Sequence, residues 1–96
     1  IYISDKQNKI IRCNVACEQI TGYSSKELIG QSPSIFNSLL HDSAFYQQIW
    51  LHVLDKGFWQ GEIWNKRKNH SVFPQWLTIS AIKDADDQLV QYLAIY

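Results

Sequence analysis

The side chains that could catalyse a reaction or hold a metal are few and scattered in this chain of 96 residues. The two cysteines, Cys13 and Cys17, lack the spacing of a CxxC redox or zinc site and are too few for a disulfide framework. We expect them to be reduced, small core residues, with a metal pair or a regulatory disulfide as the alternatives. No nucleophile stands beside a base, and there is no glycine-rich phosphate loop or metal-ligand cluster. The sequence therefore predicts a chain that is not itself an enzyme and has no metal site.

A binding site is indicated instead by the segment 58–82, which holds three of the four tryptophans together with the amide side chains of Asn65 and Gln75. The segment reads as two long strands, about Phe58–Arg67 and Val72–Lys83, because apolar residues alternate along both. Alternation assigns one inner set of side chains, expected to face the helices: Trp59, Gly61, Ile63 and Asn65 from the first strand, and Phe73, Gln75, Leu77, Ile79 and Ala81 from the second.

The register of this hairpin follows from placing Ile63 directly opposite Leu77. That pairing needs a three-residue loop, Asn69-His70-Ser71, and it places Asn65 across from Gln75. A two-residue loop would mix the inner and outer faces, because a slip of one residue turns every side chain over. We therefore predict the three-residue loop.

Two amides on the inner face need hydrogen-bond partners, because a buried amide without one costs about 1–3 kcal/mol. The partner is either protein or buried water, or else a bound ligand. For a ligand, we predict a wall formed by Trp59, Asn65 and Gln75, together with Trp50 and Leu77.

The outer face is predicted to carry Trp64 opposite Trp76, beside Pro74. A cross-strand aromatic pair stabilises a sheet by about 0.2–1 kcal/mol, so a purely local role is one reading. The other is an interface for a flanking helix or a second subunit, since exposed indoles make a patch suited to a partner. The second reading predicts a homodimer.

The remaining elements are short. "IYIS" and "KIIRCN" read as a hairpin, followed by a helix that Asn14 caps and Gly22 ends, and by another that Ser24 or Ser25 caps. Pro33 can begin a helical turn. A longer helix capped by Asp42 or Ser43 runs to Gly57, and a last strand covers about Leu89–Tyr96. The core-facing residues of the longer helix are expected to be Tyr46, Trp50, Val53 and Leu54.

This order of elements predicts an α+β fold, with an antiparallel sheet and helices on one of its faces. The nine basic and nine acidic residues cancel, so no nucleic-acid partner is indicated. "KRK" at 66–68 reads as a solvated hairpin tip. No apolar run suggests a membrane span, and we expect no direct membrane contact and a cytoplasmic location. The chain opens on Ile1 and has no methionine, so we expect one domain, 1–96, cut from a longer protein.

The pieces "ITGYS", "ELIG", "WQGEIWNKRK" and "Y.AI", in this order and spacing, resemble a PAS (sensory box) domain over essentially the whole chain. The resemblance implies a PAS fold: a five-stranded antiparallel sheet with short helices and one longer helix over one face. It also implies a pocket that holds flavin, haem or a small metabolite in some members. Relatives are commonly attached to diguanylate cyclase (GGDEF) or phosphodiesterase (EAL) domains, which turn over cyclic-di-GMP, or to histidine kinases.

The same resemblance guides the choice of cofactor, whose identity the sequence leaves unknown. Haem-type members use a histidine on or near the long helix, but His52 falls on its solvent side, and His41 lies in a loop where histidines are usually on the surface or cap a helix. Haem is therefore not expected. The light-sensing flavin subclass needs a cysteine within "QSPSIFNS", where there is none. Non-covalent flavin, as in redox and aerotaxis sensors that share the "W.G…N+RK" arrangement, remains an alternative.

Family members usually have glycine at three hairpin turns, where this chain has Asn8, His70 and Asp87. Asn, Asp and His are the non-glycine residues most enriched at positive φ, so the turns are expected to form. The leading hypothesis is a sensory module that binds a small ligand and signals through its outer sheet face to an attached effector. The alternative is a PAS domain that holds no ligand and serves dimerisation.

Overall fold

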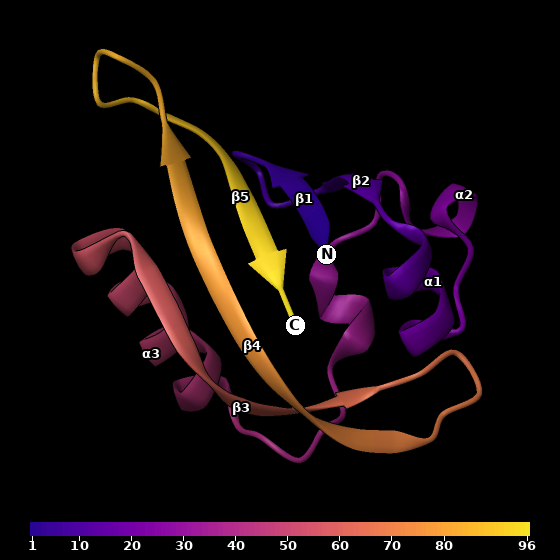
Figure 1. Cartoon of the computed structure of the whole chain (residues 1–96). Coiled ribbons are helices and arrows are strands. Elements are labelled where there is room, and N and C mark those ends of the chain that lie inside the picture. Colours follow the sequence, from indigo (N-terminus) through magenta and orange to yellow (C-terminus); the bar gives the residue numbers. More distant parts are fainter.

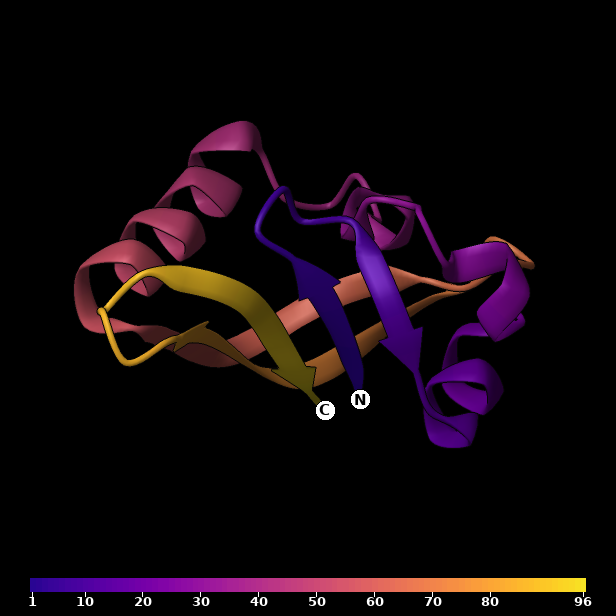
Figure 2. The ribbon, with the colours of Figure 1, turned by 90° about the horizontal axis from the view of Figure 1, so that it is seen from above.

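The computed structural model describes all residues from 1 to 96 and confirms the predicted α+β fold (Figure 1). The elements are β1 (Tyr2–Asp5), β2 (Ile10–Cys13), α1 (Val15–Thr21), α2 (Ser25–Leu28), the 3-10 helix η1 (Pro33–Phe36), α3 (Ser43–Lys56), β3 (Phe58–Lys66), β4 (Val72–Lys83) and β5 (Leu89–Ile95). The strands form one antiparallel sheet in the order β2-β1-β5-β4-β3. Seen from above, α3 and η1 lie over one face of the sheet (Figure 2).

The short helices begin where the sequence places their caps. The Asn14 side chain accepts a hydrogen bond from the Cys17 N–H, and Gly22 ends α1 at φ 80°. Ser24 and Glu27 form a reciprocal capping box around α2, in which the Glu27 N–H donates to the Ser24 hydroxyl and the Ser24 N–H donates to the Glu27 carboxylate. Local capping thus compensates for the small number of hydrogen bonds inside these helices.

Helix α3 begins at its cap Asp42, which accepts from the Phe45 N–H, and ends before Gly57 at φ 86°. Its buried residues are Ile49 and Val53, with Tyr46 and Trp50 partly buried beside them. The prediction that Leu54 faces the core is wrong, because its side chain is 64% exposed. The core-facing side follows the spacing 46, 49, 50 and 53, and position 54 lies past its edge.

The β3–β4 hairpin corrects the predicted register by two residues. Ile63 pairs with Gln75 rather than Leu77, Asn65 pairs with Phe73, and Trp64 pairs with Pro74 rather than Trp76. The loop does contain three residues between Arg67 and Ser71, whose backbones are hydrogen bonded, but it begins one residue earlier than predicted. The two faces are nevertheless as predicted, because a shift of two residues preserves the alternation of side chains.

The reason for the shift lies in the backbone of the loop. A three-residue hairpin loop ends in a left-handed residue, and His70 takes that place at φ 71°. The predicted loop would have put Ser71 there, a residue less suited to positive φ. Asn8 and Asp87 also adopt positive φ, 60° and 61°, so all three turns form without glycine.

The "KRK" stretch does more than form a solvated tip. Arg67 donates from Nε to the Ile20 carbonyl at 3.0 Å and lies over the Phe73 ring. The Lys68 backbone N–H bonds to the Thr21 carbonyl, and its ammonium lies 2.7 Å from a Glu27 carboxylate oxygen. The pKa of Glu27 is lowered, first by this lysine and then by the Ser24 backbone N–H. These contacts fasten the hairpin to α1 and α2.

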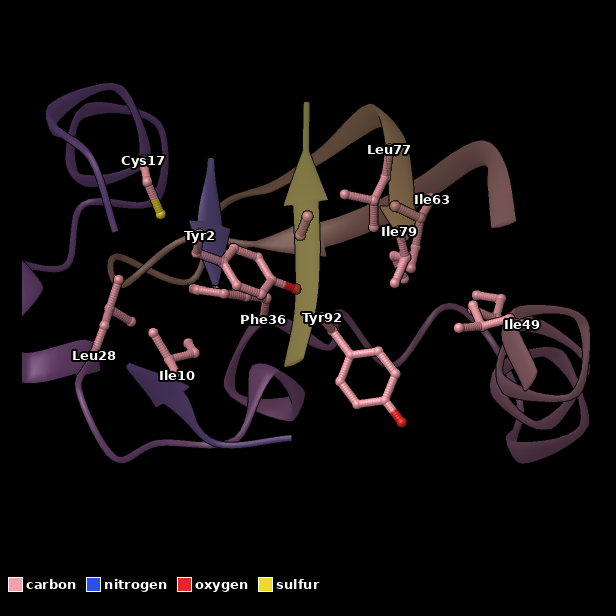
Figure 3. Close-up of a cluster of buried hydrophobic side chains, with 12 residues drawn as sticks. Tyr2, Ile10, Cys17, Leu28, Phe36, Ile49, Ile63, Leu77, Ile79 and Tyr92 are labelled. Carbon is pink, nitrogen blue, oxygen red and sulfur yellow. The ribbon is translucent and has the colours of Figure 1, made fainter. Parts of the chain in front are cut away.

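The core fills the space between the sheet and the helices (Figure 3). Twelve buried apolar residues form one cluster: Tyr2, Ile10, Cys17, Leu28, Phe36, Ile49, Val53, Ile63, Leu77, Ile79, Tyr92 and Ala94. Both cysteines are free thiols, with Cys17 buried and Cys13 partly exposed. None of the helices is long and apolar enough to cross a membrane.

Gly61 lies beneath the indole of Trp59, and this close approach is directly testable. A Cβ at position 61 would stand 2.8 Å from Cζ2 of Trp59. We expect Gly61→Ala to lower the free energy of unfolding by about 1–3 kcal/mol, the usual cost of overpacking, measured by urea unfolding. In a Trp59→Leu background, which removes the ring, the same substitution should be nearly neutral. Equal losses in both backgrounds would contradict this packing.

Candidate ligand-binding site

A cavity of about 160 Å³ lies between the inner face of the sheet and the segments η1 and α3. Five chain segments contribute its walls: the β1–β2 region, η1 with its flanks, α3, β3 and β4. The lining residues are Tyr2, Asn8, Ser32, Pro33, Ser34, Phe36, Asn37, Tyr46, Ile49, Trp50, Ile63, Asn65, Leu77 and Ile79. The cavity thus lies where the PAS resemblance predicts a pocket.

Tyr46 lines the cavity, and its side chain carries the most unusual polar group of the chain. Its hydroxyl oxygen is buried and has no hydrogen-bond partner, and it is the only buried side-chain polar atom in the chain in that condition. Burial raises the pKa of Tyr46 above its ordinary value, so the hydroxyl keeps its proton at neutral pH. A buried hydroxyl without a partner carries a penalty of about 1–3 kcal/mol, which an acceptor would relieve.

The two predicted inner amides are both buried, with Asn65 7% and Gln75 9% exposed. They sit diagonally across the strands, and Nδ2 of Asn65 donates to Oε1 of Gln75 at 2.7 Å. Of the partners considered from the sequence, they therefore use each other. No other side-chain hydrogen bond is made by this pair, so Asn65 keeps donor and acceptor capacity at the cavity it lines.

The segment between η1 and α3 runs along the free edge of β3 and completes this side of the site. Asn37 forms an isolated antiparallel bridge with Asn65. His41 accepts the backbone N–H of Trp64 on Nε2 at 3.0 Å, and its ring stacks on Phe45 at 3.9 Å between centroids. Its loop position had suggested a free surface residue or a helix cap, and His41 is neither.

Of the five side chains predicted to bind a ligand, the structure brings Trp50, Asn65 and Leu77 to the cavity. Trp59 and Gln75 do not line it. Trp59 packs over Gly61 and against Phe45 on α3, and Gln75 is hydrogen bonded to Asn65. Binding by any of the five remains a prediction.

Sequence reasoning missed Tyr46 and the η1 residues as wall components. Tyr46 was expected on the inward side of α3, and the signal available was a hydroxyl on an otherwise apolar stripe. The η1 residues offered no signal, because a short irregular segment has no periodicity from which a facing direction can be read.

The other candidate groups do not form a chemical site. His52 is exposed on α3 and contacts the Phe58 carbonyl through Nδ1, while His70 occupies the hairpin tip. Cys17 Sγ lies 3.4 Å from the Tyr96 hydroxyl, and burial raises the pKa of Cys13. No group of three or more metal-ligating side chains is present.

The outer sheet face carries exposed aromatic side chains. Trp64 is 37% and Trp76 59% exposed, and Pro74 lies opposite Trp64. Proline has no N–H to donate, and β5 pairs with β4 only from Thr78 onward, so no β5 carbonyl stands beside Pro74. The three residues predicted as an interface therefore share one open surface.

Comparison with known families decides the classification. A family model described as "PAS domain" matches residues 1–96. The chain belongs to the PAS domain family. The PAS domain is 28% identical over 95 residues to a nitrogen fixation regulatory protein of Klebsiella oxytoca, covering 99% of this chain and 19% of that protein. It is 26% identical over 92 residues to the hybrid signal transduction histidine kinase L of Dictyostelium discoideum, covering 96% of this chain and 5% of that one.

Solved structures agree with this classification. A PAS domain from Colwellia psychrerythraea superimposes with a TM-score of 0.89 at 25% identity, over 97% of this chain and 79% of that one. The dark structure of the blue-light photoreceptor Aureochrome1 LOV gives 0.86 at 19% identity, over 98% and 70%. The second likeness concerns the fold alone. The chain is thus a PAS sensory domain, a class typically found within multidomain signalling proteins, and it spans less than a fifth of the curated relatives it matches.

The Asn65–Gln75 hydrogen bond yields a double-mutant prediction. Gln75→Leu and Asn65→Leu should each lower the free energy of unfolding by about 1–3 kcal/mol, because each strands one buried amide. The double variant should lose less than the sum of the two. As a control, Gln60→Leu removes an exposed amide bonded to Thr78 and should change stability by less than about 0.5 kcal/mol. Strict additivity in urea unfolding would refute the buried pairing.

Proposed function

We propose that this PAS domain is a non-enzymatic sensory module that binds a small molecule in its inner cavity and passes the signal through its outer sheet face. The observation that carries the proposal is the cavity between the sheet and the helices, lined by Asn65, whose side chain bonds only to Gln75 and keeps hydrogen-bonding capacity for a ligand. A concave, largely apolar site with a few polar groups is the usual form of a small-molecule pocket.

A route from the cavity to the outer face is supported by the alternation of β3. Asn65 lines the cavity, and its neighbour Trp64 stands on the outer face. The bridge from Asn37 and the bond from His41 hold both positions from the edge. A ligand that binds more tightly to one position of this strand edge than to another would therefore shift the outer aromatic side chains as well.

The partner in this proposal is a second copy of the domain together with an attached effector. One of the relatives is named a histidine kinase, and a kinase or a diguanylate cyclase or phosphodiesterase acting on cyclic-di-GMP would suit the output. We place the domain in the cytoplasm, where its two free thiols would stay reduced. The competing proposal is a PAS domain used for dimerisation alone, which the exposed Trp64 and Trp76 favour.

The ligand proposal predicts a bound molecule in freshly purified protein. Denaturing extraction followed by mass spectrometry should release a small compound from the wild type. The Asn65→Leu variant, which fills one wall of the cavity with a larger apolar group, should release clearly less. Extracts of folded wild type and variant that are equally empty would contradict ligand binding and favour the dimerisation role.

The interface proposal predicts a change in self-association. Trp64→Ser combined with Trp76→Ser should raise the dimer dissociation constant at least about tenfold, because tryptophans that become buried in an interface are frequent binding hot spots. Leu51, exposed on α3 away from the sheet, offers a matched control, and Leu51→Ser should leave association unchanged. Identical sedimentation profiles for the wild type and the double variant would remove the outer face from the proposal.

A further inference from the structure

The segment between η1 and α3 is held against the edge of β3 at both of its ends. Asn37 forms the isolated bridge with Asn65, and His41 accepts the Trp64 backbone N–H on Nε2 at 3.0 Å. We call residues 37–41 the edge strap. No helix or named strand lies within it, so its place beside β3 depends on these end contacts.

A strained backbone position lies between the two contacts of the edge strap. Leu39 adopts φ 70°, a left-handed conformation that bulky residues rarely take. Its side chain is 87% exposed, so packing of that side chain does not compensate for the strain. Strained positions persist where surrounding contacts impose them. The edge strap is therefore expected to relax when one of its end contacts is lost.

The contact at His41 depends on the protonation state of the imidazole. A ring nitrogen accepts a hydrogen bond only through its lone pair, so the bond from the Trp64 N–H requires a neutral ring with its proton on Nδ1. In the imidazolium both nitrogens are donors, and a donor would then face a donor. The bond is therefore present where the ring is neutral, and it is lost as the pH falls through the range in which imidazole gains a proton, about pH 8 to 5.

The other two histidines do not share this property. His52 contacts the Phe58 carbonyl through Nδ1, where an N–H can donate in the neutral ring and in the imidazolium alike. His70 is exposed at the hairpin tip. Of the three histidines, only His41 accepts a backbone N–H, and only this contact is incompatible with a protonated ring.

The groups around His41 leave the imidazole as the one that responds to mild acid. On α3, Tyr46 meets it edge-on at 6.0 Å between ring centroids, and burial raises the pKa of Tyr46. Asp42 caps the same helix. On β3, Glu62 and Lys66 stand two residues to either side of the bonded N–H, and none of the ion pairs includes His41. Carboxylates, ammonium groups and tyrosine hydroxyls do not ordinarily titrate between about pH 5 and 8, whereas imidazole does.

We propose that His41 is a pH-sensitive latch: protonation of its imidazole breaks the bond from the Trp64 N–H and releases the edge strap from β3. The edge strap adjoins Asn65, which lines the cavity, and Trp64, which stands on the outer face, so its release gives both places a response to acid. This regulation goes beyond the proposed function, because the latch operates in the protein without a ligand.

Amide hydrogen exchange, followed by NMR on the dialysed chain with no added ligand, tests the latch. Protection of the Trp64 N–H, corrected for the pH dependence of intrinsic exchange, should fall at least about tenfold between pH 8 and pH 5, because only about one ordinary imidazole in thirty is neutral at pH 5. The Ile63 N–H is the internal reference. It points toward β4, since N–H directions alternate along a strand, and it should keep its protection.

Three variants separate the latch from a general effect of acid. His41→Gln places an amide near the position of Nε2 and does not gain a proton, so protection of Trp64 should no longer depend on pH. His41→Phe keeps a ring on Phe45 without an acceptor, so Trp64 should be as poorly protected at pH 8 as in the wild type at pH 5. His52→Gln is the matched control and should reproduce the wild-type response.

The latch is overturned if wild-type Trp64 is unprotected at pH 8, if its protection is the same at pH 8 and pH 5, or if the acid response persists in His41→Gln. An equal loss at Ile63 would mean that acid unfolds the whole domain, which also overturns it. Each of these results would leave the ligand proposal untouched, because no ligand takes part in the measurement.

Discussion

The alternation of side chains along the paired strands β3 and β4 is the constraint on which the arrangement of the site depends. These are the two longest strands, and their pairing sends the Asn65 and Gln75 amides to the inside and the Trp64 and Trp76 indoles to the outside. Because the alternation has a period of two, no local adjustment can move one set without turning over the other. At the tip of the hairpin, Arg67 also donates a hydrogen bond to the Ile20 carbonyl of α1, which attaches the sheet to the helices.

The cavity and the core compete for the same space in a small domain. Twelve buried apolar residues must stabilise 96 residues, and each polar group at the cavity weakens that core unless it finds a partner. The Asn65–Gln75 bond resolves most of this conflict inside the protein. The Tyr46 hydroxyl has no partner inside the protein, so the chain keeps one unsatisfied polar group that a phenylalanine at this position would have avoided.

The sequence was sufficient for the fold, the helix caps, the positive-φ turns and the assignment of the two sheet faces, because each depends on local residue types or on period-two alternation. It was insufficient for the register, since the choice between pairings two residues apart preserves the faces and depends on which residue takes the left-handed position, here His70. It also misplaced Leu54 and could not place η1 or His41, because their positions depend on packing against distant strands.

The bond from the Trp64 N–H to His41 has a bearing on how any other chain can approach this domain. An edge strand offers unpaired backbone groups that a foreign strand can join by extending the sheet. At β3 the imidazole nitrogen takes the place of a neighbouring strand's carbonyl, and the adjoining Asn37 bridge occupies the next position. Strand addition is blocked along this stretch of the edge, so recognition there has to proceed through side chains, where sequence changes can alter specificity without disturbing the backbone ladder.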